Sequence, residues 1–432
     1  MKAEDFIKDL SWDGLTPQTQ KMAKICVLDT LGCALAGARS EGFPSLCQAI
    51  KRLDGGCDSP VWGTEYSLSL PWSIFLNSYA AAYFDLDDGH RAAQGHPGAA
   101  VVPAALSLAL QINAGGRALL EAVVAGYEIA VRSALIMRGL GGPRKGSGGW
   151  TVTGAAAAAA RLLDLPLRNI LHALGLAEYY APQAPQDRSA SYPSQNKEGI
   201  SWAAHTGYIA AYLASSGYEA MRPYLADAPE CKNLAEIYEI QNAYHKMYAS
   251  CRWAHPAIDG LTQMRREADF TVDDIAEIRI RTFEKALLLA RNEPANTLEA
   301  LYSIPFAVAS FLIHGELSPR QMFGAALKDK SVLDLAKTIK LVEDPDLTRL
   351  FPEQCLQKIE VVFKNGAHLV SQPLSARGDP SEPYTFAELS QKFKRLSQDV
   401  LSDKWQIVVR AIEHLEDVPP GGLPILLGLE RA

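Results

Sequence analysis

The sequence predicts a mainly α-helical protein, a large all-helical domain with an inserted smaller α/β (α+β) lid domain. Helical patterns dominate the chain up to His255, and alternating strand patterns appear only beyond it. Helical patterns return near the C-terminus. We therefore expect residues 1–255 plus 384–432 to form the helical domain and residues 256–383 to form the lid domain.

The helical domain is predicted from one long amphipathic segment and a series of helices rich in small residues. The segment 17–37 places Cys26, Leu28, Leu31 and Cys33 where they can contribute to a buried stripe. "TGAAAAAARLL" is a strong helix former, and its small side chains indicate a tightly packed central helix. The other helical patterns lie at 73–83, 99–112, 116–138, 153–163, 168–178 and 199–217.

The lid domain is predicted from three segments that alternate as half-buried strands do, at 276–283, 356–363 and 368–374. The last two are joined by "KNGA", whose Asn365-Gly366 pair is a hairpin signal. The "RGDPSEP" segment disfavours helix and marks the return to the helical domain. Further helices are expected at 297–314, 318–325, 331–339, 385–398 and 401–415.

Composition and charge limit the classes of function. The chain has 432 residues, of which 48% are hydrophobic and 21% charged, as in an average soluble enzyme. Its net charge of −7 gives no electrostatic reason to expect nucleic acid or an anionic membrane as partner. The N-terminus does not resemble a signal peptide, and the seven cysteines lack paired metal spacing. We therefore expect a cytoplasmic protein with free thiols.

The segment "YFDLDDGHRAAQGHPGAA" concentrates charge between two apolar helical patterns. It could form a metal site, an acid–base site, or a loop in which aspartates cap helices and histidines bond backbone carbonyls. In a helix, Asp85 and Asp88 would share a face and Asp87 would point elsewhere. No second ligand cluster is found in the sequence, so no metal is expected. The titratable residues of this segment are Asp85, Asp87, Asp88, His90 and His96.

Cationic residues gather in three further segments. Lys145 lies in the glycine-rich "GLGGPRKGSGGW", which lacks the order of a nucleotide-binding motif and can also be a solvated surface loop. Lys197 precedes a helix, where its charge opposes the helix dipole; it is either a ligand-binding or an ordinary surface lysine. Lys246, Arg252 and His255 lie among aromatic and small residues that indicate partial burial. Buried cations need acidic partners or an anionic ligand.

Together these residues are suited to a polyanionic small molecule and to proton transfer. Cations can bind carboxylates and stabilise the charge that forms when a proton α to one of them is removed. A histidine, lysine or aspartate can act as the base if its pKa lies near neutrality. The segment 299–317, which contains Phe306, is mostly an apolar helix, and a core role suits it.

These segments, in this order, resemble the MmgE/PrpD family, which includes 2-methylcitrate dehydratases, cis-aconitate decarboxylases and iminodisuccinate epimerase. The similar blocks are "QKMAKICVLDTLGCALAGA", "YFDLDDGHRAAQGHPGAA", "GAAAAAARLLDL", "NKEGISWAAHTG", "YASCRWAHPAIDGL" and "YSIPFAVASFLIHGEL". The resemblance covers nearly the whole chain. It implies a helical domain with an α/β lid, a site between them, a homodimer, and no metal or organic cofactor.

The resemblance also implies roles for single residues. Asp85 and His96 fall on the family's active-site aspartate and histidine. Lys197 and Lys246 fall on its two lysines, and His255 falls on the histidine of its "HPA" block.

Three positions depart from the family pattern. Gly89 stands where relatives carry threonine, Lys145 where they carry histidine, and Phe306 where they often carry tyrosine. We therefore expect the catalytic residues to be Asp85, His96, Lys145, Lys197 and Lys246, and the substrate-binding residues to be Gly89, His90, Arg252, His255 and Phe306.

The resulting hypothesis is a cofactor-independent lyase that abstracts a proton α to a carboxylate of a small di- or tricarboxylate, as a dehydratase or decarboxylase. The three departures favour an alternative, an isomerase or epimerase in which a lysine and His96 are two facing bases. A non-catalytic relative that binds a carboxylate, and a metal-dependent enzyme, are hypotheses of other classes.

Overall fold

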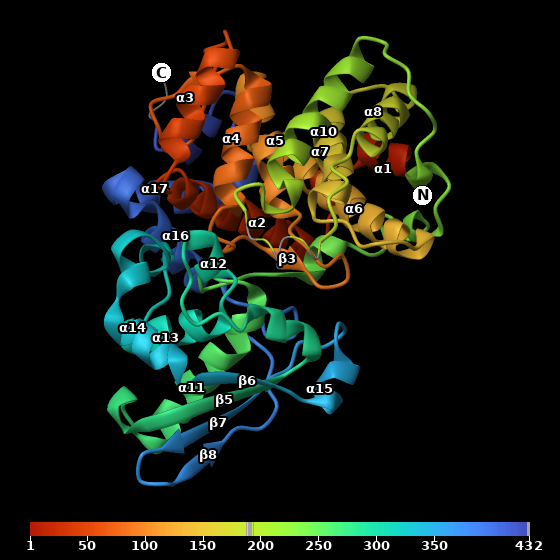
Figure 1. Ribbon diagram of the computed structural model, residues 1–432. Coiled ribbons are helices and arrows are strands. Elements are labelled where there is room, and N and C mark those ends of the chain that lie inside the picture. Colours follow the sequence, from red (N-terminus) through yellow and green to blue (C-terminus); the bar gives the residue numbers. More distant parts are fainter. Residues whose placement is uncertain (187, 189–191, 193, 430–432) are drawn as a thin grey trace.

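The computed structural model describes residues 1–429 except 187, 189–191 and 193. A helical body fills the upper half of Figure 1, and a part that contains the main sheet lies below it. The predicted fold class, mainly α with a smaller sheet-containing part, is confirmed.

The helical body is built around α7, whose six consecutive alanines are fully buried. A Cβ atom on Gly154 of α7 would lie 2.5 Å from the carbonyl oxygen of Gly126 in α6, so glycines set the distance between these two helices. The body comprises α1 (Ala3–Asp9), α2 (Pro17–Gly37), α3 (Phe43–Leu53), α4 (Leu70–Ala82), α5 (Gly98–Gln111), α6 (Gly116–Leu140), α7 (Gly148–Leu162), α8 (Leu167–Tyr179) and α10 (Ile200–Ser215).

Two small antiparallel strand pairs join segments of the body. The pair of β1 (Ser59–Pro60) and β2 (Ser67–Leu68) closes a turn before α4. The pair of β3 (Gly89–His90) and β4 (Ala243–Tyr244) places Gly89 opposite Tyr244. The second pair therefore joins the charged segment after α4 to the segment that contains Lys246.

The main sheet has the strand order β6-β5-β7-β8, in which only β5 and β6 are parallel. Ile278, Ile280, Ile359 and Val361 are fully buried, because α11 and α13 cover this face of the sheet. The strands and helices of this part are β5 (Ile275–Thr282), β6 (Ile339–Glu343), β7 (Lys358–Phe363), β8 (His368–Val370), α11 (His255–Ala268), α12 (Thr297–Leu301), α13 (Ile304–His314), α14 (Lys330–Lys337) and α15 (Pro345–Leu350).

Local details of this part differ from the prediction. The hairpin at Asn365-Gly366 is present, with Gly366 at φ 83°. The helix expected at 297–314 is broken, because the Ser303 side chain accepts from the Phe306 N–H and starts a new helix, α13. The helix expected at 318–325 is two 3₁₀ turns. Strand β6 was not expected, since a short strand directly after a helix has no turn signal of its own.

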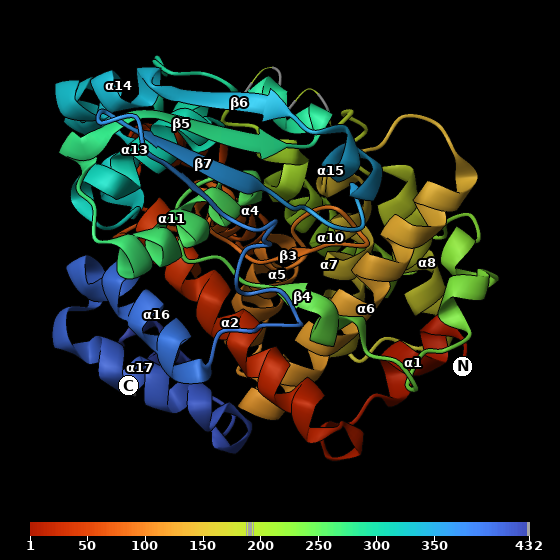
Figure 2. The ribbon, with the colours of Figure 1, turned by 90° about the horizontal axis from the view of Figure 1, so that it is seen from below.

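The chain returns to the helical body through α16 (Phe386–Leu401) and α17 (Trp405–Glu413). Helix α16 lies alongside α2 in Figure 2. Lys392 of α16 donates to Asp29 of α2 at 2.6 Å and to the Leu86 carbonyl oxygen at 2.8 Å, and all three groups are buried. The C-terminal helices therefore support the base of the charged segment. The residue boundaries expected for the two domains stay predictions.

Two further observations concern membrane-spanning helices and the cysteines. Within the described residues, no helix combines the length and the apolar character needed to cross a bilayer. All seven cysteines are free thiols, and most of them are buried.

Candidate active site

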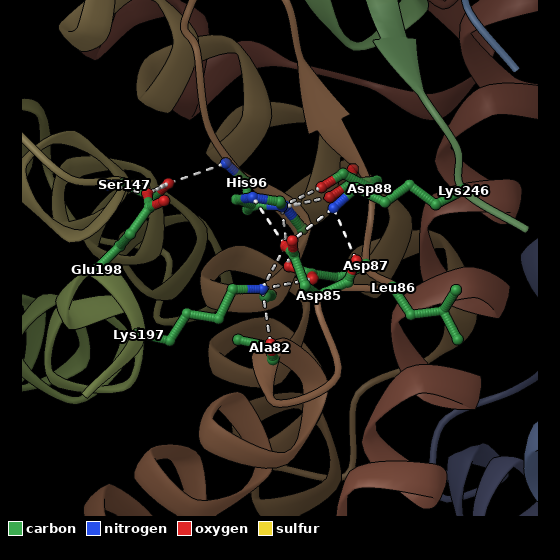
Figure 3. Close-up of polar contacts among 12 residues, drawn as sticks. Ala82, Asp85, Leu86, Asp87, Asp88, His96, Ser147, Lys197, Glu198 and Lys246 are labelled. Carbon is green, nitrogen blue, oxygen red and sulfur yellow. Dashed lines mark hydrogen bonds and ion pairs between the residues drawn. The ribbon is translucent and has the colours of Figure 1, made fainter. Parts of the chain in front are cut away.

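Asp85 and Asp87 lie on the loop between α4 and β3, and this loop is fully buried. Asp85 has φ 50°, a left-handed conformation that is uncommon for a residue other than glycine. The bend directs the carboxylates of Asp85 and Asp87 to the same side, where both meet Lys197 (Figure 3). In a helix these two side chains would point apart.

The Asp85 carboxylate is the centre of the buried polar cluster. Its Oδ1 atom lies 2.7 Å from Lys197 Nζ, 2.9 Å from Lys246 Nζ and 3.5 Å from His96 Nε2 (Figure 3). Burial alone would raise the pKa of Asp85, but the charges of Lys197 and Lys246 hold it well below its ordinary value. Asp85 is therefore ionised at neutral pH.

Lys197 has a partner for each of its three N–H groups. It donates to the Ala82 carbonyl oxygen at 2.7 Å, to Asp85 at 2.7 Å and to Asp87 at 3.3 Å. Burial lowers the pKa of Lys197, but the two carboxylates outweigh it and the pKa is raised. Lys197 therefore stays charged and holds the two carboxylates together.

Lys246 differs from Lys197 because it also faces the open space of the site. It donates to the backbone carbonyl oxygen of Asp85 at 2.8 Å and to the Asp85 side chain at 2.9 Å. These bonds use two of its three N–H groups. Lys246 lines the cleft described below, so the third N–H can reach a ligand.

His96 is held in one orientation by acceptors around its Nδ1 atom. The backbone carbonyl oxygen of Asp88 lies 2.8 Å from Nδ1, and Oδ2 of Asp87 lies 3.3 Å from it. Because both oxygens only accept, Nδ1 carries a hydrogen, and Nε2 is the atom left to exchange a proton. Burial lowers the pKa of His96, but the charge of Asp87 outweighs it and the pKa is raised.

Asp88 points away from this cluster and caps α5. Its Oδ1 atom accepts from the N–H of Gly98, the first residue of α5, at 3.0 Å, and Oδ2 accepts from the Tyr127 hydroxyl. Burial raises the pKa of Asp88 to about 7, and the nearby charges of Asp29 and Asp87 act in the same direction.

A second set of hydrogen bonds fixes the backbone of His96. Its N–H donates to Ser147 Oγ at 3.1 Å, and Ser147 donates through Oγ to Glu198 at 2.5 Å. The Ser147 N–H also donates to Glu198 at 2.8 Å. Glu198, with φ 54°, lies between Lys197 and α10. The starts of α7 and α10 are thus joined to the charged loop.

The cluster opens onto a cleft of about 410 Å³ between the helical body and the sheet-containing part. Asp85, His96 and Lys246 line it from the body, and Trp253, Leu288 and Phe351 give it an apolar wall on the opposite side. Four more cations among its described lining residues outnumber the carboxylates, which favours an anionic ligand. These cations are Arg91, Arg144, Arg252 and Lys285.

Asp379 fixes two of the cleft arginines. Its Oδ2 atom accepts from Arg91 at 2.6 Å, and its Oδ1 atom accepts from Arg252 at 3.0 Å. Arg252 also donates to the Ala376 carbonyl oxygen at 3.0 Å and lies over the Tyr244 ring at 4.9 Å from its centroid. The two guanidinium groups are thus held in place before any ligand binds.

Some of the residues expected at the site lie elsewhere. Lys145 donates to the Gln183 carbonyl oxygen at 3.4 Å and lines a neighbouring hollow. His255 is fully buried, with Nε2 3.3 Å from the Ser250 carbonyl oxygen, and burial holds its pKa well below the ordinary value. Phe306 is also fully buried, whereas Tyr302 lines the cleft. The roles predicted for Lys145, His255 and Phe306 stay predictions.

His90 and Gly89 lie beside the cluster. His90 lines the cleft, its Nδ1 accepts from the Ala93 N–H at 3.2 Å, and its Nε2 lies 3.4 Å from Glu239. Gly89 faces Tyr244 across the β3–β4 pair.

Sequence reasoning missed several residues of the cleft. Arg91 directly follows His90, and Glu198 directly follows Lys197. Their position next to predicted site residues was the only local sign that they line the cleft. Asp379 lies in the segment that was interpreted only as a domain crossing, and nothing local marks it as a partner of arginines. The lining residues missed in this way are Arg91, Glu198, Tyr244 and Tyr302.

The ligand atoms of Asp85, Asp87 and His96 lie within 4.8 Å of one another, as metal ligands do. However, Asp85 and Asp87 already accept from the Lys197 ammonium group, and Asp85 also accepts from Lys246. A divalent cation bound there would lie beside two positive charges. The cluster is therefore a poor fit for a metal, since the lysines already neutralise its carboxylates.

The cleft, with a buried aspartate, histidine and lysine at its wall, is of the kind found in enzymes that act on small anionic molecules. Its residues 3–232 match the MmgE/PrpD N-terminal domain, and residues 248–416 match the MmgE/PrpD C-terminal domain. The chain belongs to the MmgE/PrpD family.

Similar proteins of known activity include three named cis-aconitate decarboxylase. The mouse (Mus musculus) protein is 26% identical, covering 96% of this chain and 90% of its own length. The human protein is 25% identical, with coverages of 94% and 89%. The Aspergillus terreus protein is 23% identical, with coverages of 96% and 93%.

Proposed function

We propose that this chain is a cofactor-independent lyase that transfers a proton at the carbon α to a carboxylate of a small di- or tricarboxylate, as a dehydratase or a decarboxylase. The main support is that the Asp85 carboxylate contacts His96, Lys197 and Lys246 at the wall of a cleft rich in cations. The relatives named cis-aconitate decarboxylase support the substrate class, because cis-aconitate is a tricarboxylate.

Substrate carboxylates bind to the cations that line the cleft. Arg91 and Arg252 are held by Asp379 and offer their remaining N–H groups. Lys246, which also lines the cleft, offers its third N–H. Charge-assisted hydrogen bonds to ionised groups are about twice as strong as neutral ones. Two or three carboxylates can therefore be held with the α carbon facing His96.

His96 transfers the proton through Nε2. In dehydration, neutral Nε2 takes the α proton, the electron pair forms an enolate, and hydroxide leaves the neighbouring carbon. In decarboxylation, the C–C bond to the leaving CO₂ breaks, and protonated Nε2 gives its proton to the carbon that keeps the electron pair. The cations of the cleft stabilise the negative charge in both reactions. The charge of Asp87 raises the pKa of His96 and so favours the protonated ring, which is the form that decarboxylation uses.

The isomerase or epimerase alternative needs a second base opposite His96. Lys197 does not support it, because its raised pKa keeps it charged and all three of its N–H groups are engaged. Lys145, which stands at the family's histidine position, lines the neighbouring hollow and not the cleft. The lyase is therefore the proposal, and the expected homodimer and cytoplasmic location remain predictions.

The experiment is incubation of the purified protein in heavy water with 2-methylcitrate, cis-aconitate, citrate and iminodisuccinate, followed by NMR. For at least one acid we expect either the alkene product of dehydration, or loss of CO₂ with one deuterium at the carbon that gains the proton. Deuterium exchange with inversion of configuration at the α carbon, without loss of water or CO₂, would instead support the isomerase. Tight binding of an acid without any turnover or exchange would support a non-catalytic carboxylate-binding protein.

A further inference from the structure

The hydroxyl end of Tyr244 occupies the space where a side chain at position 89 would begin. Gly89 and Tyr244 are directly opposite in the antiparallel β3–β4 pair. Directly opposite residues of such a pair place their side chains on the same face. A Cβ atom on Gly89 would lie 2.3 Å from both Oη and Cζ of Tyr244. Such distances are far inside van der Waals contact, so only glycine leaves room for this ring.

The Tyr244 ring is fixed in this position from its other side. The guanidinium of Arg252 lies over the ring at 4.9 Å from its centroid. Arg252 is itself held by Asp379 at 3.0 Å and by the Ala376 carbonyl oxygen at 3.0 Å. The ring cannot swing away from Gly89 without breaking this arrangement, so the phenol is positioned before a ligand binds.

The Tyr244 hydroxyl is available to a ligand. The residue is 9% exposed, yet it lines the cleft beside Lys246 and Arg91. Within the described part of the chain, its hydroxyl has no hydrogen-bond partner. Burial raises the pKa of Tyr244 well above its ordinary value, so the phenol keeps its proton at neutral pH and can donate a hydrogen bond.

We propose that Tyr244 is a catalytic residue that donates a hydrogen bond to the substrate oxygen on which negative charge develops, and that Gly89 provides the space for it. The proposal rests on the proposed lyase function. It adds to the cations of the cleft a neutral donor at a fixed position, and a fixed donor stabilises developing charge without reorganisation.

The first test compares Tyr244→Phe with Tyr238→Phe, on whichever acid the wild type converts. Phenylalanine keeps the ring over Gly89 and removes only the hydroxyl. Tyr238 is a matched control because it is also 9% exposed but lies in the helical body near Phe6. Removal of one donor to developing charge lowers kcat by about 100-fold or more. We expect a fall in kcat of at least about tenfold for Tyr244→Phe, and a change within about twofold for Tyr238→Phe.

The second test is a double-mutant cycle between positions 89 and 244. Gly89→Ala alone forces a methyl group into the phenol and should lower kcat as strongly as Tyr244→Phe. In a Tyr244→Ala background the same methyl group meets no ring, so Gly89→Ala should cause no further loss. Multiplicative losses in the double variant would overturn the assigned role of Gly89.

The two proposals fail in different ways. If the wild type is active and Tyr244→Phe keeps its kcat within about twofold, Tyr244 is not a catalytic donor and the lyase function stands. If the wild type neither converts any of the four acids nor binds propane-1,2,3-tricarboxylate in calorimetry, the lyase function fails, and the role of Tyr244 as a substrate contact fails with it.

Discussion

The Nδ1 atom of His96 lies 2.8 Å from the backbone carbonyl oxygen of Asp88. A carbonyl oxygen can only accept, so the Nδ1 atom is the donor and the Nε2 atom is free to exchange a proton with a ligand. Nε2 lies 3.5 Å from Asp85 at the wall of the cleft. This single relationship decides which side of the ring can act in catalysis.

Replacement of His96 tests that role. We expect His96→Gln to lower kcat by about 10²- to 10⁴-fold, because an amide cannot transfer a proton at this position. Binding of propane-1,2,3-tricarboxylate should change little, since the cations of the cleft remain. Retention of full activity by His96→Gln would sink the assignment of His96 as the proton-transfer group.

Lys197 should matter for stability as well as activity. Lys197→Met leaves the buried carboxylate of Asp87 without an ammonium partner. Loss of one partner of a buried ion pair costs about 3–5 kcal/mol of unfolding free energy. Urea unfolding should therefore show a large loss for Lys197→Met and a smaller one for Lys246→Met, where Asp85 keeps Lys197. Equal losses would contradict the hydrogen bonds assigned to the two lysines.

Lys246 and Lys145 should differ in their effect on the reaction. Lys246 lines the cleft, and a hydrogen bond to a charged group contributes about 1.5–3 kcal/mol, so Lys246→Met should lower kcat/KM by about 10- to 150-fold. Lys145 lies in the neighbouring hollow, and Lys145→Met should change kcat/KM by less than about threefold. A loss above about 100-fold for Lys145→Met would instead support the catalytic role expected from its sequence position.

Asp379 should control substrate affinity through Arg91 and Arg252. Asp379→Asn removes the charge that holds both guanidinium groups, so we expect KM to rise by about tenfold with a smaller change in kcat. Asp399→Asn is the matched control, because Asp399 pairs with Arg320 on the exposed surface. Similar kinetics for both variants would show that the arginines do not need Asp379.

Asp88 gives the protein a pH-dependent stability that can be measured separately. Its pKa is raised to about 7 in the folded state, against about 3.9 for an unperturbed aspartate. Between these values the folded state binds more protons than the unfolded state, so the unfolding free energy falls as pH rises from about 4 to about 7. At about 1.4 kcal/mol per pKa unit, the total is on the order of 4 kcal/mol.

Asp88→Asn should remove this pH dependence. Asparagine can still accept from the Gly98 N–H, and its amide can donate to the Tyr127 hydroxyl. The variant should therefore be more stable than the wild type at pH 8 and similar to it at pH 4. The lowered pKa values of Asp85 and Asp87 act in another window, because the stability they add is lost only below about pH 4. If the unfolding free energies of variant and wild type changed with pH in the same way, the pKa assigned to Asp88 would be contradicted.

Much of the fold could be predicted because helical periodicity is local. The bounds 17–37 predicted for the first long helix are those of α2, and the alanine-rich segment is the centre of the body. Strand β6 could not be predicted, since its position depends on pairing with β5, which lies about 60 residues earlier in the chain.

The sequence by itself determined most of the long helices, the hairpin and the residue types of the candidate site, because these depend on neighbours within a few positions. The tertiary structure alone decided which side chains meet. Asp85 pairs with Lys197 and Lys246 across 112 and 161 positions, and Arg252 reaches Asp379 across 127. The left-handed backbone of Asp85 brings Asp85 and Asp87 together, where helical spacing would have paired Asp85 with Asp88. Such contacts follow from packed helices and loop dihedrals, which no local pattern specifies.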